Sequence, residues 1–66
     1  MNKDLFDEKV DALGLKYNFI AEKLGISPQA LNRKRNSDIP FTIKEVNLIK
    51  GLLNLTNTER DKIFFD

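Results

Sequence analysis

The chain has 66 residues, of which 41% are hydrophobic and 32% charged, and its formal net charge is +1. This length allows one domain at most, and the composition is typical of a foldable, soluble chain rather than a disordered one. Cysteine and histidine are absent, which excludes disulfides and thiolate metal sites and removes the usual neutral-pH acid–base group. Because no apolar run approaches roughly 18 residues and the first residues are acidic, we expect neither a membrane span nor a secretory signal.

The charges are distributed unevenly along the chain. Residues 1–13 carry two lysines and four carboxylates, a net of −2, and residues 51–66 carry two basic and three acidic side chains, a net of −1. Residues 14–50 carry seven basic and three acidic side chains, a net of +4. A local basic region is what attraction to phosphate requires, even where the whole chain is nearly neutral.

The hydrophobic pattern predicts five helices and no strand. The first covers about residues 3–13, where Asn2 is placed to cap the helix and Gly14 to end it. Its apolar residues share one face, which we expect to be buried: Leu5, Phe6, Val10 and Leu13. Its acidic residues should point to solvent on the other side: Asp4, Asp7, Glu8 and Asp11. With no histidine or buried lysine nearby, these carboxylates indicate a solvated face rather than catalysis.

The second and third helices are expected over residues 17–24 and 28–35. Gly25 suits the left-handed backbone that leaves the second helix in one step. Ser27 is a good N-cap, and Pro28 occupies the first helical position, where a missing N–H costs nothing. Two short helices joined by a tight glycine turn are typical of a helix–turn–helix DNA-binding unit. The alternative is an all-helical domain with an ordinary tight turn.

The third helix favours the DNA-binding interpretation, because only Ala30 and Leu31 are clearly apolar in it. A purely structural helix would carry a wider apolar stripe. The remaining residues form one exposed polar face: Pro28, Gln29, Asn32, Arg33 and Asn36. Glutamine and asparagine can pair bidentately with adenine, and arginine with guanine. We therefore predict base contacts by four residues of this helix: Pro28, Gln29, Asn32 and Arg33.

Contacts to the DNA backbone are predicted from the polar and basic residues around this face. The free N–H groups at the start of the second helix form an anion site, and the Ser27 hydroxyl lies at the start of the third. The predicted backbone contacts are Lys16, Tyr17, Asn18, Ser27, Lys34, Arg35, Asn36 and Lys44. For each the alternative is an ordinary solvated side chain, and the stem of Lys34 could instead cover the core.

A loop over residues 36–40 leads to the fourth helix. Thr42 and Glu45 form a capping box, and Phe41 and Val46 are placed as a hydrophobic staple. The buried residues expected along the helix are Ile43, Val46, Ile49, Leu52 and Leu53.

A second capping box, Thr56 with Glu59, begins the fifth helix, which carries Ile63, Phe64 and Phe65. Two adjacent phenylalanines do not both fit one small core easily. We therefore expect one to pack inside and the other to be exposed as a contact with a partner or a second copy. The alternative is that both lie between the first and fourth helices.

Four short motifs follow in order: Leu31-Asn-Arg-Lys34, Phe41-Thr-Ile-Lys-Glu-Val46, Leu55-Thr-Asn-Thr-Glu59 and Ile63-Phe-Phe65. Together with residues 15–36 they resemble the phage Cro and repressor helix–turn–helix family, over nearly the whole chain. The resemblance is closest to small Cro-like regulators of phages and prophages of Gram-positive bacteria. Tyr17 stands where many relatives have a phosphate-contacting glutamine. Lys34 and Arg35 stand where many have an apolar residue and a glutamate.

The resemblance implies a five-helix, lambda-repressor-like fold that binds double-stranded operator DNA, usually as a homodimer. It implies a transcriptional repressor in the bacterial cytoplasm. From the missing histidine and cysteine we expect no enzyme activity, no cofactor and no metal. An alternative from another class remains open. The near-neutral charge, the acidic first helix and the Phe64-Phe65 end are also compatible with an antirepressor that binds a phage repressor protein.

Overall fold

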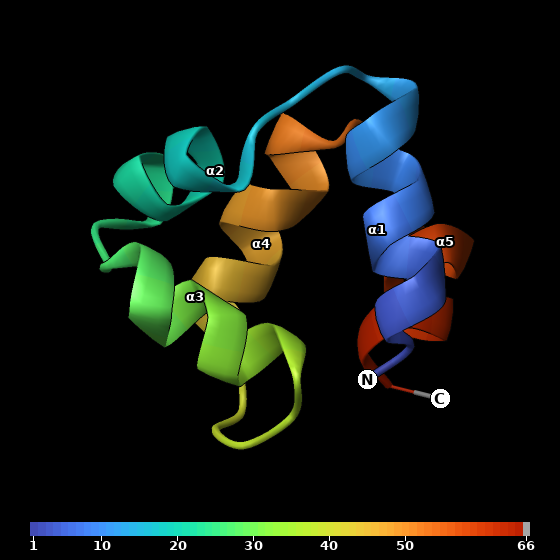
Figure 1. Ribbon diagram of the computed structural model, residues 1–66. Helices are drawn as coiled ribbons and strands as arrows, with labels where there is room; N and C mark the ends of the chain where they lie inside the picture. Colours follow the sequence, from blue (N-terminus) through green and yellow to red (C-terminus); the bar gives the residue numbers. More distant parts are fainter. Residues whose placement is uncertain (66) are drawn as a thin grey trace.

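The computed structural model describes residues 1–65, which form five helices and contain no strand (Figure 1). The helices are α1 (Lys3–Ala12), α2 (Tyr17–Leu24), α3 (Pro28–Arg35), α4 (Ile43–Leu52) and α5 (Asn57–Phe64). The predicted all-α architecture is confirmed for these residues. In Figure 1, α4 lies between the α2–α3 pair and the α1–α5 pair, and the start of α1 lies close to the end of α5. None of these helices has the length and apolar character that crossing a membrane requires.

Side-chain caps fix where four of the helices begin. Asn2 Oδ1 accepts from the N–H of Leu5 at 3.1 Å, and Ser27 Oγ accepts from the N–H of Ala30 at 3.0 Å. Both predicted capping boxes are present, at the starts of α4 and α5. Only α2 begins without a side-chain cap, at Lys16. Such caps satisfy N–H groups that the first turn of a helix leaves unpaired, so they define the helix starts from local sequence alone.

A three-residue turn separates α2 from α3. Gly25 has φ +71° and ends α2, and the N–H of Ile26 donates to the carbonyl of Ala21 at 3.0 Å. A side chain in this left-handed conformation would be strained, which is why glycine suits the position. The turn sets α3 against α2 with no room for a flexible linker.

Each helix contributes to a single hydrophobic core. The largest fully buried side chains are Phe6, Val10, Ile20, Leu31, Ile49 and Ile63. The ring of Phe41 extends this core, lying 6.2 Å from the ring of Phe6 and 5.4 Å from that of Phe64, measured between centroids. The N–H of Asn2 donates to the carbonyl of Ile63 at 2.7 Å, which joins the start of α1 to the end of α5.

Two residues that we expected in the core are exposed. Leu13 follows the last residue of α1 and is 49% exposed, because the chain turns at Gly14 and Leu15 packs against the core instead. Ile43 is 68% exposed. It lies one turn before the exposed Asn47, beside the buried stripe that Val46 and Ile49 belong to rather than within it.

Candidate nucleic-acid interface

The α2–α3 pair presents one polar face of α3 to solvent. Ile20 and Ala21 of α2 and Leu31 of α3 are buried between the helices and the rest of the core. The outer face of α3 carries five exposed residues: Pro28, Gln29, Asn32, Arg33 and Asn36. These are the residues of the predicted polar face. Within residues 1–65, no ion pair involves Arg33.

A cleft of about 210 Å³ joins this face to the start of α2. Its walls come from both helices: Tyr17 and Asn18 at the start of α2, and Pro28, Leu31, Asn32 and Arg35 of α3. The structure therefore brings two predicted base contacts, Pro28 and Asn32, beside three predicted backbone contacts. Lys16, Ser27 and Lys44 are exposed but do not line the cleft.

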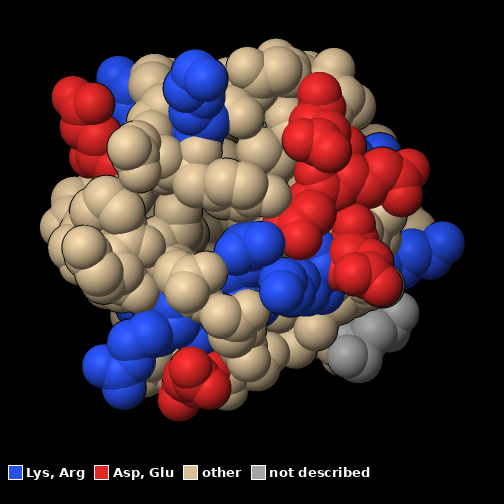
Figure 2. Space-filling model, viewed as in Figure 1, with Lys and Arg blue, Asp and Glu red and all other residues tan. Residues whose placement is uncertain are grey.

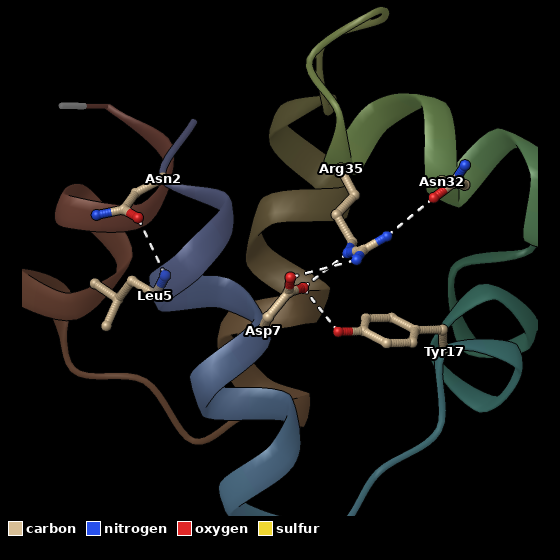
Figure 3. Close-up of polar contacts among 6 residues, drawn as sticks. All are labelled: Asn2, Leu5, Asp7, Tyr17, Asn32 and Arg35. Atoms are coloured by element: carbon tan, nitrogen blue, oxygen red, sulfur yellow. Dashed lines mark hydrogen bonds and ion pairs between the residues drawn. The ribbon is translucent and has the colours of Figure 1, made fainter.

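Arg35 at the end of α3 is paired within the chain. Its Nε donates to Asp7 Oδ1 at 2.7 Å and its Nη2 to Asp7 Oδ2 at 3.3 Å, which joins α3 to α1 (Figure 3). Its Nη1 donates to Asn32 Oδ1 at 2.9 Å. The phosphate contact expected of Arg35 stays a prediction; in the structure its guanidinium donates to a carboxylate, which balances its charge.

Tyr17 completes this cluster. Its hydroxyl donates to Asp7 Oδ1 at 2.7 Å, and the guanidinium carbon of Arg35 lies 4.6 Å from the centre of its ring. Burial and the hydrogen bond to Asp7 raise the pKa of the Tyr17 phenol. Burial alone would raise the pKa of Asp7, but hydrogen bonds from Arg35 and Tyr17 outweigh it and lower that pKa. The cluster thus holds an ionised carboxylate between three helices.

Asp7 is the residue that the sequence did not reveal. We expected it on a solvated face with the other acids of α1, and that expectation was wrong, since its carboxylate faces α2 and α3. Helical periodicity places Asp7 at the edge of the buried face of α1, next to Phe6 in the sequence. It does not predict which helices pack against that edge. The opposite charge of Arg35 was the available signal, 28 residues away in the chain.

Lys34 is also paired within the chain. Its Nζ lies 2.7 Å from Oε1 of Glu45 and 6.0 Å from the centre of the Phe41 ring. Burial raises the pKa of Glu45, but the hydrogen bonds from Lys34 and from the Thr42 backbone outweigh burial and lower it. Lys34 therefore takes the alternative that we weighed for it, a side chain laid over the core.

Figure 2 shows how these pairs divide the charge on one face of the molecule. Carboxylates gather over α1, and basic side chains adjoin them on the side of α3. Lys34 and Arg35 have carboxylate partners inside the chain, whereas Arg33 and Lys16 are exposed and take part in no ion pair among residues 1–65.

No protein-family model, curated protein or solved structure matches the chain. What this surface could bind is therefore inferred from its own residues and geometry.

The two terminal phenylalanines differ in environment. Phe64 packs against Phe41 and lies 6.5 Å from Phe6 between ring centroids, whereas Phe65 is 57% exposed. Phe65 borders a groove of about 330 Å³ that also includes Ile39 and Pro40. One ring inside and one outside is the arrangement that we expected of adjacent phenylalanines.

Proposed function

We propose that this protein is a sequence-specific DNA-binding transcriptional regulator of the Cro-like type. In this proposal α2 and α3 form a helix–turn–helix unit, and α3 reads operator DNA in the major groove. The proposal rests mainly on the polar face of α3, which exposes amide and guanidinium groups instead of an apolar stripe. Recognition helices present such residues to base edges from their N-terminal part.

In this proposal three side chains of α3 contact the bases. Gln29 lies in the first turn of α3, and Arg33 follows one turn later on the same side. Asn32 lies between them and the cleft. Paired with a matching base, a bidentate side chain discriminates by about 1–3 kcal/mol. Pro28 adds an apolar contact at the edge of the same surface.

Backbone contacts would come from groups that have no partner in the chain's own ion pairs. Lys16, Asn18 and Ser27 are exposed around the start of α2 and α3, and α2 begins without a side-chain cap. Its first N–H groups can therefore donate hydrogen bonds to a phosphate oxygen. Asn36 and Lys44 are the remaining exposed candidates. Tyr17, Lys34 and Arg35 would act through their contacts within the protein instead.

The proposed partner is double-stranded operator DNA bound by a homodimer in the bacterial cytoplasm. One α3 of eight residues can touch only a few base pairs. Two copies on half-sites about one helical turn apart would supply the affinity that a single copy lacks. Binding across a promoter would then repress transcription.

Selection from a pool of random duplexes at two salt concentrations tests this proposal. Enrichment of a near-palindrome by the wild-type protein, weakened by salt and by Arg33→Ala, is the expected result. Lys62→Ala is the matched control, because Lys62 is an exposed cation on α5, away from the polar face. Failure to enrich any sequence at either salt concentration would contradict the proposal.

One observation favours a second candidate function. Phe65 is 57% exposed beside the groove of about 330 Å³, and an exposed aromatic next to a groove is typical of a protein contact. An antirepressor would use this surface to bind a phage repressor protein. Such binding would depend little on salt and would be lost in Phe65→Ala, whereas operator binding would weaken steeply with salt.

A further inference from the structure

The amide of Asn32 is oriented by a hydrogen bond within α3. Arg35 lies three residues after Asn32 on α3, and Nη1 of Arg35 donates to Asn32 Oδ1 at 2.9 Å. Because arginine carries only donors, the carbonyl oxygen of Asn32, and not its nitrogen, must face Arg35. Figure 3 shows the amide nitrogen on the side away from Arg35. The side chain therefore turns its two N–H donors outward.

Arg35 is itself held from two sides. Two of its nitrogens donate to the two oxygens of Asp7 at 2.7 and 3.3 Å, a forked pairing that restricts the guanidinium plane. The guanidinium carbon lies 4.6 Å from the centre of the Tyr17 ring. With Nε and Nη2 on Asp7, the third nitrogen, Nη1, reaches Asn32. The orientation of Asn32 is thus set from α1.

We propose that Asp7 and Arg35 are positioning residues that restrict Asn32 to hydrogen-bond acceptors on base edges. This inference rests on the proposed function and adds a rule of base choice to it. An unrestrained asparagine uses both its oxygen and its nitrogen to select adenine. An asparagine whose oxygen points toward Arg35 presents its N–H groups to the DNA instead, and these donate to N7 of adenine, to N7 or O6 of guanine and to O4 of thymine. Asn32 then disfavours cytosine, which presents only a donor, and no longer distinguishes adenine from guanine.

Base preferences of three proteins test this rule: the wild type, Asn32→Ala and Arg35→Lys. Asn32→Ala identifies the base pair that Asn32 reads, as the position whose preference disappears. Arg35→Lys keeps the charge, but a single ammonium cannot occupy the fork on Asp7 and reach Asn32 together. At that position we expect the wild type to select adenine and guanine within about threefold of each other, and Arg35→Lys to prefer adenine by roughly tenfold.

Asp7→Asn is a second variant that acts from another helix. It weakens the fork on Arg35 without changing α3, so it should shift the same position in the same direction. It also carries the test if Arg35→Lys does not fold, as judged by circular dichroism. In the free protein, the side-chain amide of Asn32 should be rigid on the nanosecond timescale by NMR relaxation, and mobile in both variants.

The outcomes separate this inference from the regulator proposal. A wild type that prefers adenine over guanine by roughly tenfold at this position overturns the inference alone. Base preferences that stay unchanged in both Arg35→Lys and Asp7→Asn also overturn the inference, even if the Asn32 amide becomes mobile in these variants. An Asn32→Ala protein whose base preferences are unaltered at every position overturns it as well. If the wild type enriches no sequence at all, the regulator proposal fails and the inference fails with it.

Discussion

Nζ of Lys34, near the end of α3, lies 2.7 Å from Oε1 of Glu45, in the first turn of α4. The same Glu45 oxygen accepts from the N–H of Thr42 at 2.8 Å, so one carboxylate closes a capping box and joins two helices. Glu45 is 8% exposed and is the one buried charged residue in residues 1–65. A charge that is this shielded depends on its partners, because water cannot replace them.

Glu45→Gln should therefore destabilise the protein. The amide can still accept from Thr42, but the ion pair with Lys34 is lost, so we expect the free energy of unfolding to fall by about 1–2 kcal/mol. Urea unfolding at pH 7 measures this. Asp61→Asn is the control, since the Asp61 carboxylate also has a basic partner, Arg60, but is exposed. An effect of Asp61→Asn as large as that of Glu45→Gln would show that burial does not set the strength of the Glu45 pair.

Stability should decline in acid. The pKa of Glu59 is lowered from 4.5 to about 2 by the hydrogen bonds from Lys9 and the Thr56 backbone, and the pKa values of Asp7 and Glu45 are also lowered. A carboxyl whose folded pKa lies below its unfolded value stabilises the fold above the unfolded pKa. That contribution is lost as pH falls through the folded pKa.

We therefore expect stability to be nearly constant from pH 6 to 8, because the chain has no histidine, and to fall from about pH 4.5 to about pH 2. Thermal unfolding followed by circular dichroism across this range measures the decline. The variant Asp7→Asn/Glu45→Gln/Glu59→Gln should start lower and decline less. An equally steep decline in this variant would assign the acid sensitivity to other groups.

The two glycines at positions 25 and 51 should respond in opposite ways to alanine. Gly25 has φ +71°, so Gly25→Ala strains the turn between α2 and α3 although no atom lies within 4 Å of the added Cβ. We expect a loss of about 1 kcal/mol. Gly51 lies within α4 with open space around it, and Gly51→Ala should gain roughly 0.5–1 kcal/mol. Urea unfolding of both variants checks the contrast, and stabilisation by Gly25→Ala would be inconsistent with the left-handed turn.

The starts of the helices were predictable because they depend on neighbouring residues. Ser27 with Pro28, and the Thr42 and Thr56 capping boxes, are local signals, and each is found at the start of a helix. The position of Ile43 was not predictable in the same way. An apolar residue in a first turn can lie on either side of the buried stripe, and only the packing of α4 decides which.

The candidate site likewise has features that the sequence predicts and features that it does not. Exposure of Gln29 and Arg33 follows from the thin apolar stripe of α3, which the sequence displays. The engagement of Arg35 by Asp7 does not follow, because it needs α1 and α3 to meet at one particular angle. Such contacts between distant segments are tertiary facts that no local pattern contains.

The two terminal phenylalanines offer a further test. Phe64 packs against Phe41 at 5.4 Å between ring centroids, so Phe64→Ala should cost about 2 kcal/mol, less than a fully buried ring because Phe64 is half-buried. Phe65→Ala should change the free energy of unfolding by less than about 0.5 kcal/mol. Chemical denaturation measures both. Equal losses would show that Phe65 belongs to the core.

If the protein binds DNA as proposed, the salt dependence of its affinity should show which cations contact phosphate. Lys16→Ala and Lys44→Ala should each reduce the slope of log affinity against log salt by about 0.9. Lys62→Ala on α5 should leave the slope unchanged, because its exposed ammonium lies away from the polar face. Fluorescence anisotropy over a salt series measures the slopes. A common reduction in all three variants would indicate nonspecific attraction rather than defined contacts.

The hydrogen bond from Asn2 to Ile63 has a consequence for the order in which the chain folds. It ties together residues separated by nearly the whole sequence, and closing so long a loop costs more entropy than forming the turns between neighbouring helices. Helices α2, α3 and α4 can assemble through shorter loops, so the folding nucleus should form there and α1 should dock last. Mutations in the α2–α3 contact would then slow folding, whereas mutations at the α1–α5 contact would mainly speed unfolding.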